Sequence, residues 1–207
     1  MQMLSALSIP SRPLSGLVTR ELLVPGAFVL AILVSNYVLA ALPNVKLFDL
    51  LVFVAGATLG LRRGVLVAVA AWLVYDIANP WGPAQAPLLL TKMGAEMGYA
   101  IGGALFARLM SASTLQLGPS KASLGFVLAA LITTIAYDFA TNLYIAYFWA
   151  SMAGSTEYVR WIGVALFGPG ALLFMLLHVG SNVVLFPVFG PLFIKGTERA
   201  KRSLGLE

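Results

Sequence analysis

The sequence predicts an all-α integral membrane protein, a single bundle of six transmembrane helices with the N and C termini in the cytoplasm. Three observations lead to this prediction. Hydrophobic residues make up 60% of the 207 residues and charged residues only 10%, with a mean hydropathy of +0.92, which is not the composition of an ordinary soluble domain. The apolar residues form six stretches bounded by charges, proline or glycine. The basic residues are also distributed unevenly among the connecting loops.

The six expected helices form one transmembrane domain over residues 1–207. The second and third are only about 15 residues long, roughly 22 Å against a hydrocarbon core of about 30 Å. A re-entrant hairpin would place Arg62 and Arg63 inside the bilayer, at about 2.5 to 3.5 kcal/mol each. We therefore expect two full crossings with local thinning of the bilayer. The expected helices are 22–42, 47–61, 64–79, 87–109, 123–150 and 161–192.

The basic residues predict the orientation of these helices. With six crossings, ten of the thirteen Lys and Arg residues fall on the side of the N-terminus, and only Lys46, Lys92 and Arg160 fall on the other. Under the positive-inside rule, the side with ten is the cytoplasm. The ten are Arg12, Arg20, Arg62, Arg63, Arg108, Lys121, Lys195, Arg199, Lys201 and Arg202.

The charge distribution, the absence of cysteine and the absence of catalytic motifs argue against several classes of function. The net charge of +5 is spread between apolar stretches rather than gathered into a patch, so we expect no nucleic-acid partner. There is no cysteine for a disulfide, thiolate or cysteine-ligated metal. One histidine, with no His-Glu-x-x-His and no Gly-x-Ser-x-Gly motif, leaves neither a metal cage nor an activated nucleophile. We therefore expect no enzyme activity, no metal and no cofactor.

Ionisable side chains in the middle of two expected helices are the strongest candidates for a site, because such residues are costly in lipid. Asp138 and Asn142 share one face of the fifth helix, and His178 and Asn182 have the same spacing in the sixth. Because these helices are antiparallel, we hypothesise a direct contact between Asp138 and His178. Aromatic side chains lie in the same stretch of the fifth helix, including Tyr137 and Tyr144.

Two interpretations of this cluster stay open. Interhelical hydrogen bonds worth about 0.6 to 2 kcal/mol each would hold the two helices together. Alternatively, the cluster lines a polar cavity reached from outside, with aromatic rings as stacking faces for a ligand. We favour the cavity, because aliphatic residues hold two helices at lower cost than a carboxylate and an imidazole.

The outer loops supply further candidates around the mouth of such a cavity. Asp76, Asn79 and Trp81 lie where the third helix ends, and Asn-Pro and Gly-Pro pairs there predict a turn. An ordinary helix end also explains them. Asn44 lies in the first outer loop, and its neighbours Lys46 and Asp49 need no ligand to be at an interface.

The fourth and first helices carry patterns with a packing and a functional interpretation. Lys92 and Glu96 are four residues apart and can pair on one face, or coordinate a ligand carboxylate or amide. The same helix repeats Gly94, Gly98 and Gly102, which predicts close helix packing. In the first helix, the small residues Ala27 and Ala31 predict packing within the bundle or, alternatively, an external helical partner.

Taken together, these landmarks resemble the S components of energy-coupling factor (ECF) transporters, the membrane subunits that capture vitamins and related micronutrients. The resemblance extends from about Leu22 to Phe193. It rests on these segments in order: Leu42-Pro43-Asn44-Val45-Lys46-Leu47, Gly60-Leu61-Arg62-Arg63-Gly64, Tyr75-Asp76, Asn79-Pro80-Trp81-Gly82-Pro83, Tyr137-Asp138, Thr141-Asn142, and His178 with Ser181-Asn182.

The resemblance implies a multi-pass protein of the prokaryotic plasma (inner) membrane with a substrate site near the outer face. It also implies that Ala27 and Ala31 match the family's Ala-x-x-x-Ala motif, which docks against the T component. The resemblance further implies that two ATPase subunits drive release of the cargo. This chain has no Gly-x-x-x-x-Gly-Lys-Ser/Thr motif of its own, so ATP hydrolysis must come from partners. The alternatives are a solitary proton-coupled transporter, using Asp138 and His178, and a structural membrane subunit.

Overall fold

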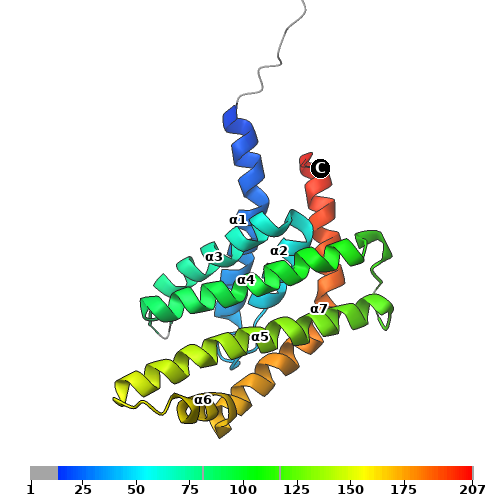
Figure 1. Cartoon of the computed structure of the whole chain (residues 1–207). Helices are drawn as coiled ribbons and strands as arrows, with labels where there is room; N and C mark the ends of the chain where they lie inside the picture. Colours follow the sequence, from blue (N-terminus) through cyan, green and yellow to red (C-terminus); the bar gives the residue numbers. More distant parts are fainter. Residues whose placement is uncertain (1–13, 81, 117, 207) are drawn as a thin grey trace, which may run out of the picture.

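The computed structural model describes residues 14–80, 82–116 and 118–206, and this part of the chain is an all-α bundle (Figure 1). The most extensive contacts join helices that are not consecutive along the chain, α2 with α4 and α5 with α7, and α2 lies at the centre. The described elements are α1 (Leu14–Val38), α2 (Phe48–Leu59), α3 (Leu61–Ile77), α4 (Ala86–Leu109), the short 3-10 turn η1 (Ala112–Thr114), α5 (Lys121–Met152), α6 (Tyr158–Phe167) and α7 (Pro169–Leu204).

The last expected helix, over 161–192, is divided in the structure. The chain breaks at Gly168, which has an extended backbone (ψ 148°), and α7 begins with Pro169. Proline disfavours a helical conformation in the residue before it but is well suited to the first position of a helix. α7 then continues past the expected end at residue 192, because Lys201 and Arg202 stabilise its last turn and Gly205 caps it with a left-handed backbone.

The second and third expected helices are separated by a single residue. Gly60 has φ of 84°, a conformation that glycine adopts without steric cost, and it reverses the chain between α2 and α3. Ten of the twelve residues of α2 are buried. Because α2 is surrounded by other helices, its length does not have to match the thickness of the hydrocarbon core.

Two of the described helices, α5 and α7, are long and apolar enough to cross a membrane by length and composition. They have 32 and 36 residues and mean hydropathies of 1.7 and 2.0 over their most apolar windows. Three shorter helical segments are also apolar: residues Leu22–Val38 of α1, the whole of α2 and the whole of α6. These helices agree with a membrane protein, whereas the number of crossings and the orientation stay predictions.

Many large apolar side chains face outward, whereas several charged and polar ones are buried together with the apolar core. Ile77, Ile132 and Leu176 are 83%, 68% and 66% exposed, whereas Asp49 and Glu96 are completely buried. A soluble domain hides its large apolar side chains and rarely buries a carboxylate. The arrangement therefore agrees with a protein whose outer surface contacts lipid.

The closest helix packing is between α2 and α4, at glycines other than those of the expected stripe. A Cβ atom on Gly56 would collide with the backbone of Ala100, and one on Gly103 would collide with the carbonyl of Phe53. By contrast, a Cβ atom on Gly94 or Gly98 would meet nothing within 4 Å. The predicted close packing of α4 is thus present, but the expected stripe was wrong at these two residues, because α2 lies against a different face of α4.

The first residues of α1 and the end of α7 lie at the same end of the bundle (Figure 1). Lys201 near the end of α7 donates a hydrogen bond of 2.7 Å to the carbonyl of Thr58, which joins the end of α7 to the end of α2. Arg62, Arg63 and Arg108 lie on the adjoining ends of α3 and α4. We call this the basic end; the α1–α2, α3–α4 and α5–α6 connections lie at the opposite end.

The glycine contacts predict a large difference between two Gly→Ala substitutions in α4. Gly103→Ala should lower the unfolding free energy by about 1–3 kcal/mol, because a methyl group would push α2 away. Gly98→Ala is the matched control and should be neutral or stabilising by up to about 1 kcal/mol, because alanine favours helix and has space there. Thermal unfolding in detergent measures both, and equal effects would contradict the packing described here.

Candidate functional site

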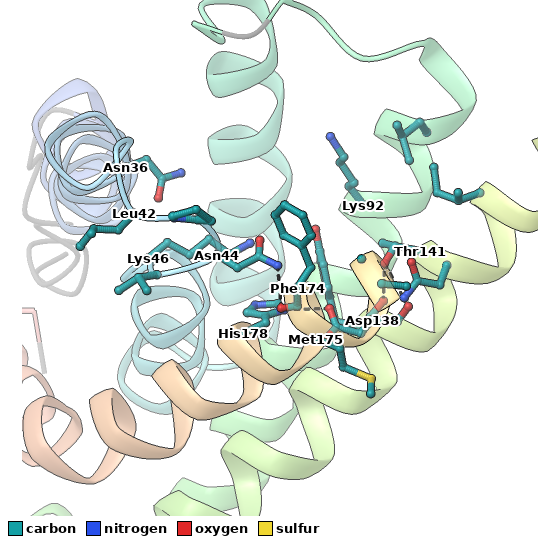
Figure 2. A pocket seen from close by; sticks show the side chains of 18 of the residues that line it. Asn36, Leu42, Asn44, Lys46, Lys92, Asp138, Thr141, Phe174, Met175 and His178 are labelled. Carbon is teal, nitrogen blue, oxygen red and sulfur yellow. Dashed lines mark hydrogen bonds and ion pairs between the residues drawn. The ribbon is translucent and has the colours of Figure 1, made fainter. Parts of the chain in front are cut away.

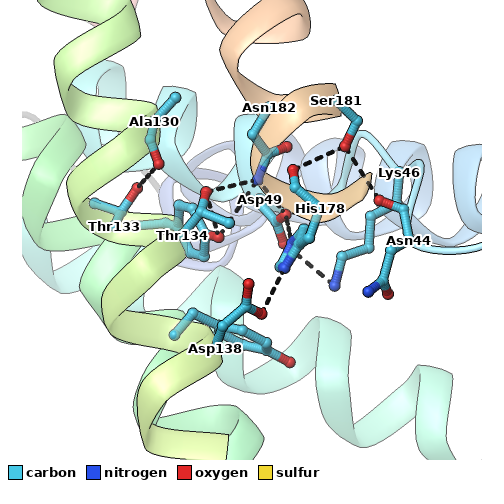
Figure 3. Close-up of polar contacts among 12 residues, drawn as sticks. Asn44, Lys46, Asp49, Ala130, Thr133, Thr134, Asp138, His178, Ser181 and Asn182 are labelled. Carbon is cyan, nitrogen blue, oxygen red and sulfur yellow. Dashed lines mark hydrogen bonds and ion pairs between the residues drawn. The ribbon is translucent and has the colours of Figure 1, made fainter. Parts of the chain in front are cut away.

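His178 of α7 lies between two carboxylates from different helices (Figure 3). Its Nδ1 is 2.7 Å from Oδ1 of Asp138 on α5, and its Nε2 is 2.7 Å from Oδ2 of Asp49 on α2. All three residues are at least nine-tenths buried. An imidazolium satisfies both contacts by donating from both ring nitrogens, and its charge offsets part of the charge of the two aspartates.

Asn182, one turn after His178, extends these contacts. Its side-chain amide donates to Oδ2 of Asp49 at 2.8 Å and to Oγ1 of Thr134 at 2.9 Å. The hydroxyl of Tyr99 donates to the same Thr134 oxygen at 3.1 Å. The i, i+4 spacing places His178 and Asn182 on one face of α7, so that both side chains reach the aspartate of α2. We call these six residues the buried polar network: Asp49, Tyr99, Thr134, Asp138, His178 and Asn182.

The predicted contact between Asp138 and His178 is confirmed. Asp49 was expected to be an outer-loop residue outside the site, whereas it lies in the first turn of α2 and is completely buried. The signal was present, since Asp49 interrupts an apolar run and a buried charge requires a partner. Nothing in the local sequence, however, indicated that His178, 129 residues away, would supply that partner.

Lys46, in the loop before α2, adds a second cation next to the network. Its Nζ is 3.5 Å from Oδ1 of Asp49 and lies 5.2 to 5.8 Å from the ring centroids of Tyr137, Trp72 and Phe48. Burial by itself lowers the pKa of Lys46, but the nearby carboxylates, chiefly that of Asp49, outweigh this effect and raise it above the ordinary lysine value. Lys46 is therefore positively charged at neutral pH.

Lys92 and Glu96 do not pair with each other in the described part of the chain, although their spacing allowed it. The indole of Trp72 on α3 comes between them. Its Nε1 donates to Oε2 of Glu96 at 3.2 Å, and the Nζ of Lys92 lies 5.1 Å from its ring centroid. The expected ion pair was therefore wrong, because a neighbouring helix supplies Trp72 to both side chains.

A cavity of about 1010 Å³ adjoins the buried polar network, and Figure 2 shows side chains that line it, Asp138 and His178 among them. Because the α1–α2 loop forms part of its wall, the cavity lies at the end of the bundle opposite the basic end. Side chains from α1, α3, α4, α5, α6 and α7 and from the α1–α2 loop form its wall. Asp138 and His178 belong both to the cavity wall and to the network. The expected site residues that line the cavity are Asn44, Asn79, Lys92, Tyr137, Asp138, Asn142 and His178.

Four other expected site residues do not line this cavity. Asp76 accepts a hydrogen bond of 3.0 Å from the backbone N–H of Ala84 and so closes the α3–α4 connection, as an ordinary helix end would. Glu96 and Asn182 are completely buried behind the wall. Tyr144 stacks on Phe148, with ring centroids 6.3 Å apart. Trp81, also expected at the mouth, lies outside the described residues.

The α1–α2 loop is held against α7 by Asn44. The side-chain amide of Asn44 donates to the backbone carbonyl of Phe174 at 3.0 Å, and the backbone carbonyl of Asn44 accepts from Oγ of Ser181 at 3.1 Å. Its φ of 54° is a left-handed conformation that asparagine tolerates better than most residues. This anchoring places Lys46 in the cavity wall. Other residues of the wall were not among the expected site residues: Asn36, Trp72, Tyr75, Phe174 and Met175.

Ala27 and Ala31 are both exposed on the outer face of α1. Nothing in the described part of the chain would contact a Cβ atom on the adjacent Gly26. The structure therefore does not support the first interpretation of this pair, in which Ala27 and Ala31 pack within the bundle. The small residues leave a smooth strip of helix that another helix can approach closely.

Comparison of the chain with protein-family models, with curated proteins and with solved structures finds no match. Among the described residues, no group of three or more His, Asp or Glu side chains is arranged to hold a metal ion.

The buried polar network predicts that loss of Asp49 is far more damaging than loss of an exposed acid. Asp49→Ala should lower the unfolding free energy by about 3–5 kcal/mol, because it leaves His178 and Asn182 without their shared acceptor. Glu157→Ala is the control: its ion pair with Arg160 is exposed, and its loss should change stability by less than about 1 kcal/mol. Similar small changes in thermal unfolding would show that the network does not hold the helices together.

Proposed function

We propose that this protein captures a vitamin or related small micronutrient at the outer face of a prokaryotic plasma (inner) membrane for import. The observation that carries the proposal is the cavity of about 1010 Å³ with Asp138 and His178 in its wall. Ligand cavities of roughly 300–1,000 Å³ typically combine an apolar lining with a few fixed polar groups. Here the buried polar network holds both side chains at the base of an otherwise mainly apolar and aromatic wall.

Three features support six crossings with both ends in the cytoplasm. α1 begins and α7 ends at the basic end of the bundle (Figure 1). The opposite end, where the cavity lies, has only Lys46, Lys92 and Arg160 among its basic residues. Under the positive-inside rule the basic end faces the cytoplasm, so that the cavity faces outward. The outward-facing apolar side chains agree with contact to lipid on the remaining surface.

We further propose that the chain works as the S component of an ECF transporter, with a T component and two ATPase subunits as partners. The exposed Ala27 and Ala31 on α1 support a helical partner, because small residues allow close helix approach in a membrane. ATP hydrolysis would come from the partners. Uptake that continues in ATP-depleted cells but stops when the proton gradient is removed would contradict this scheme. It would instead favour a solitary proton-coupled transporter using His178 and its two carboxylates.

The proposed orientation can be tested by cysteine labelling, because the natural chain contains no cysteine. Thr156→Cys lies in the α5–α6 connection and Ser113→Cys in the α4–α5 connection, and both positions are exposed. A membrane-impermeant maleimide should label Thr156→Cys in intact cells and Ser113→Cys only after permeabilisation. Labelling of both positions from outside, or the reverse pattern, would refute the proposed topology.

Ligand capture can be tested by mass spectrometry of small molecules released from the mildly purified protein, followed by thermal-shift assays with a vitamin panel. We expect one stoichiometric compound that raises the unfolding temperature of the emptied protein. Asn142→Leu should weaken its binding about tenfold, because Asn142 lines the cavity. Tyr144→Phe, outside the cavity wall, should bind normally. The absence of any bound compound and of any shift would refute capture and favour a structural subunit.

A further inference from the structure

Two lysines lie beside one aromatic side chain in the cavity wall. The Nζ atoms of Lys46 and Lys92 lie 5.7 Å and 5.1 Å from the Trp72 ring, and all three residues line the cavity. Lys46 comes from the α1–α2 loop and Lys92 from the outer end of α4, so that they approach the cavity from different elements (Figure 2). Two like charges near one ring repel each other, which disfavours the empty cavity.

The ammonium groups have donors that the described part of the chain does not satisfy. Each ammonium carries three N–H donors. Lys46 has a single ion pair there, of 3.5 Å to Asp49, which occupies at most one of its three donors. Lys92 has neither an ion pair within 4 Å nor a hydrogen bond to any described residue. Its Nζ lies over the Trp72 ring, and the carboxylate of Asp76 acts on it only from beyond ion-pair distance. A ring face attracts a cation but accepts no conventional hydrogen bond, so both groups are available to an anion.

The carboxylates around the cavity are already engaged or hidden. Asp49 bonds to His178 and Asn182, and Oδ1 of Asp138 bonds to His178. Oδ2 of Asp138 is buried and has no hydrogen-bond partner among the described residues. Glu96 is completely buried and accepts from the indole N–H of Trp72. A protonated His178 and Lys46 together balance the two aspartates. Lys92 is then the cation of the cavity wall that has no carboxylate within ion-pair distance among the described residues; Asp76, which acts on it from farther away, already accepts a hydrogen bond from the backbone N–H of Ala84.

We propose that the captured molecule is a small organic anion with one negative charge, whose acidic group is bound by Lys92 beside Trp72. This inference rests on the proposed capture function and specifies its substrate class. Lys46 contributes positive potential from the other side of the site, and a low-dielectric cavity strengthens that attraction. The apolar or aromatic remainder of the ligand packs against side chains such as Tyr137, Phe174 and Met175.

The test uses the compound that the full-length protein retains on mild purification, together with its primary amide, which has nearly the same shape and no charge. The protein should bind the acid at least about tenfold more tightly than the amide. Lys92→Met should lose at least about tenfold in affinity for the acid and little for the amide, and Lys92→Arg should retain binding of the acid. Arg160→Met is the matched control, because it removes an exposed positive charge away from the cavity wall and should bind the acid normally.

Each outcome separates this inference from the function on which it rests. A retained compound that is neutral or cationic would overturn the anion inference and leave the capture function standing. An acidic compound whose affinity is equal in Lys92→Met and in the unsubstituted protein would also overturn it, provided that both proteins unfold at similar temperatures. If no compound is retained and none of a panel of carboxylic acids and their amides binds, both the inference and the capture function fail.

Discussion

The double contact of His178 with Asp49 and Asp138 is the interaction on which the rest of the structure depends. It joins α7 to α2 and α5 through two distances of 2.7 Å among side chains that are nearly or completely buried. A charged group in such surroundings is tolerated only with an opposite charge and satisfied hydrogen bonds. The three helices must therefore keep the register that brings these groups together. The same register forms the base of the cavity, because His178 and Asp138 also belong to its wall.

The polar interior is possible because α2 lies inside the bundle rather than beside it. Gly56 and Gly103 allow the backbones of α2 and α4 to touch, and a side chain at either position would prevent this approach. This packing brings Asp49 within reach of α7 and leaves space beside the first turns of α4. Lys92 and Trp72 line that space. The close packing of α2 against α4 thus also determines where the positive charge of the cavity wall lies.

The sequence predicted some contacts well and others poorly, for identifiable reasons. The pair Asp138 and His178 was predicted because both are costly groups near the middle of antiparallel helices. Lys92 and Glu96 were expected to pair because they share a helix face, but Trp72 of α3 contacts both instead. Tyr144 was placed in the site with its aromatic neighbours, yet it stacks on Phe148 outside the cavity wall. For Lys92 and Glu96, the packing of α3 against α4 supplied Trp72 as their partner. For Tyr144, the packing of the helices left its side chain outside the cavity wall.

The all-α class, most of the helices and the polar residues that require an explanation were predictable from the sequence, because composition and periodicity are local properties of the chain. The contact of Asp49 with His178, the packing of Gly103 rather than Gly98 against α2, and the set of side chains that line the cavity follow from the folded arrangement. A spacing of four residues shows which side chains share a helix face. It does not show which neighbouring helix that face meets, and this depends on the packing of all the helices together.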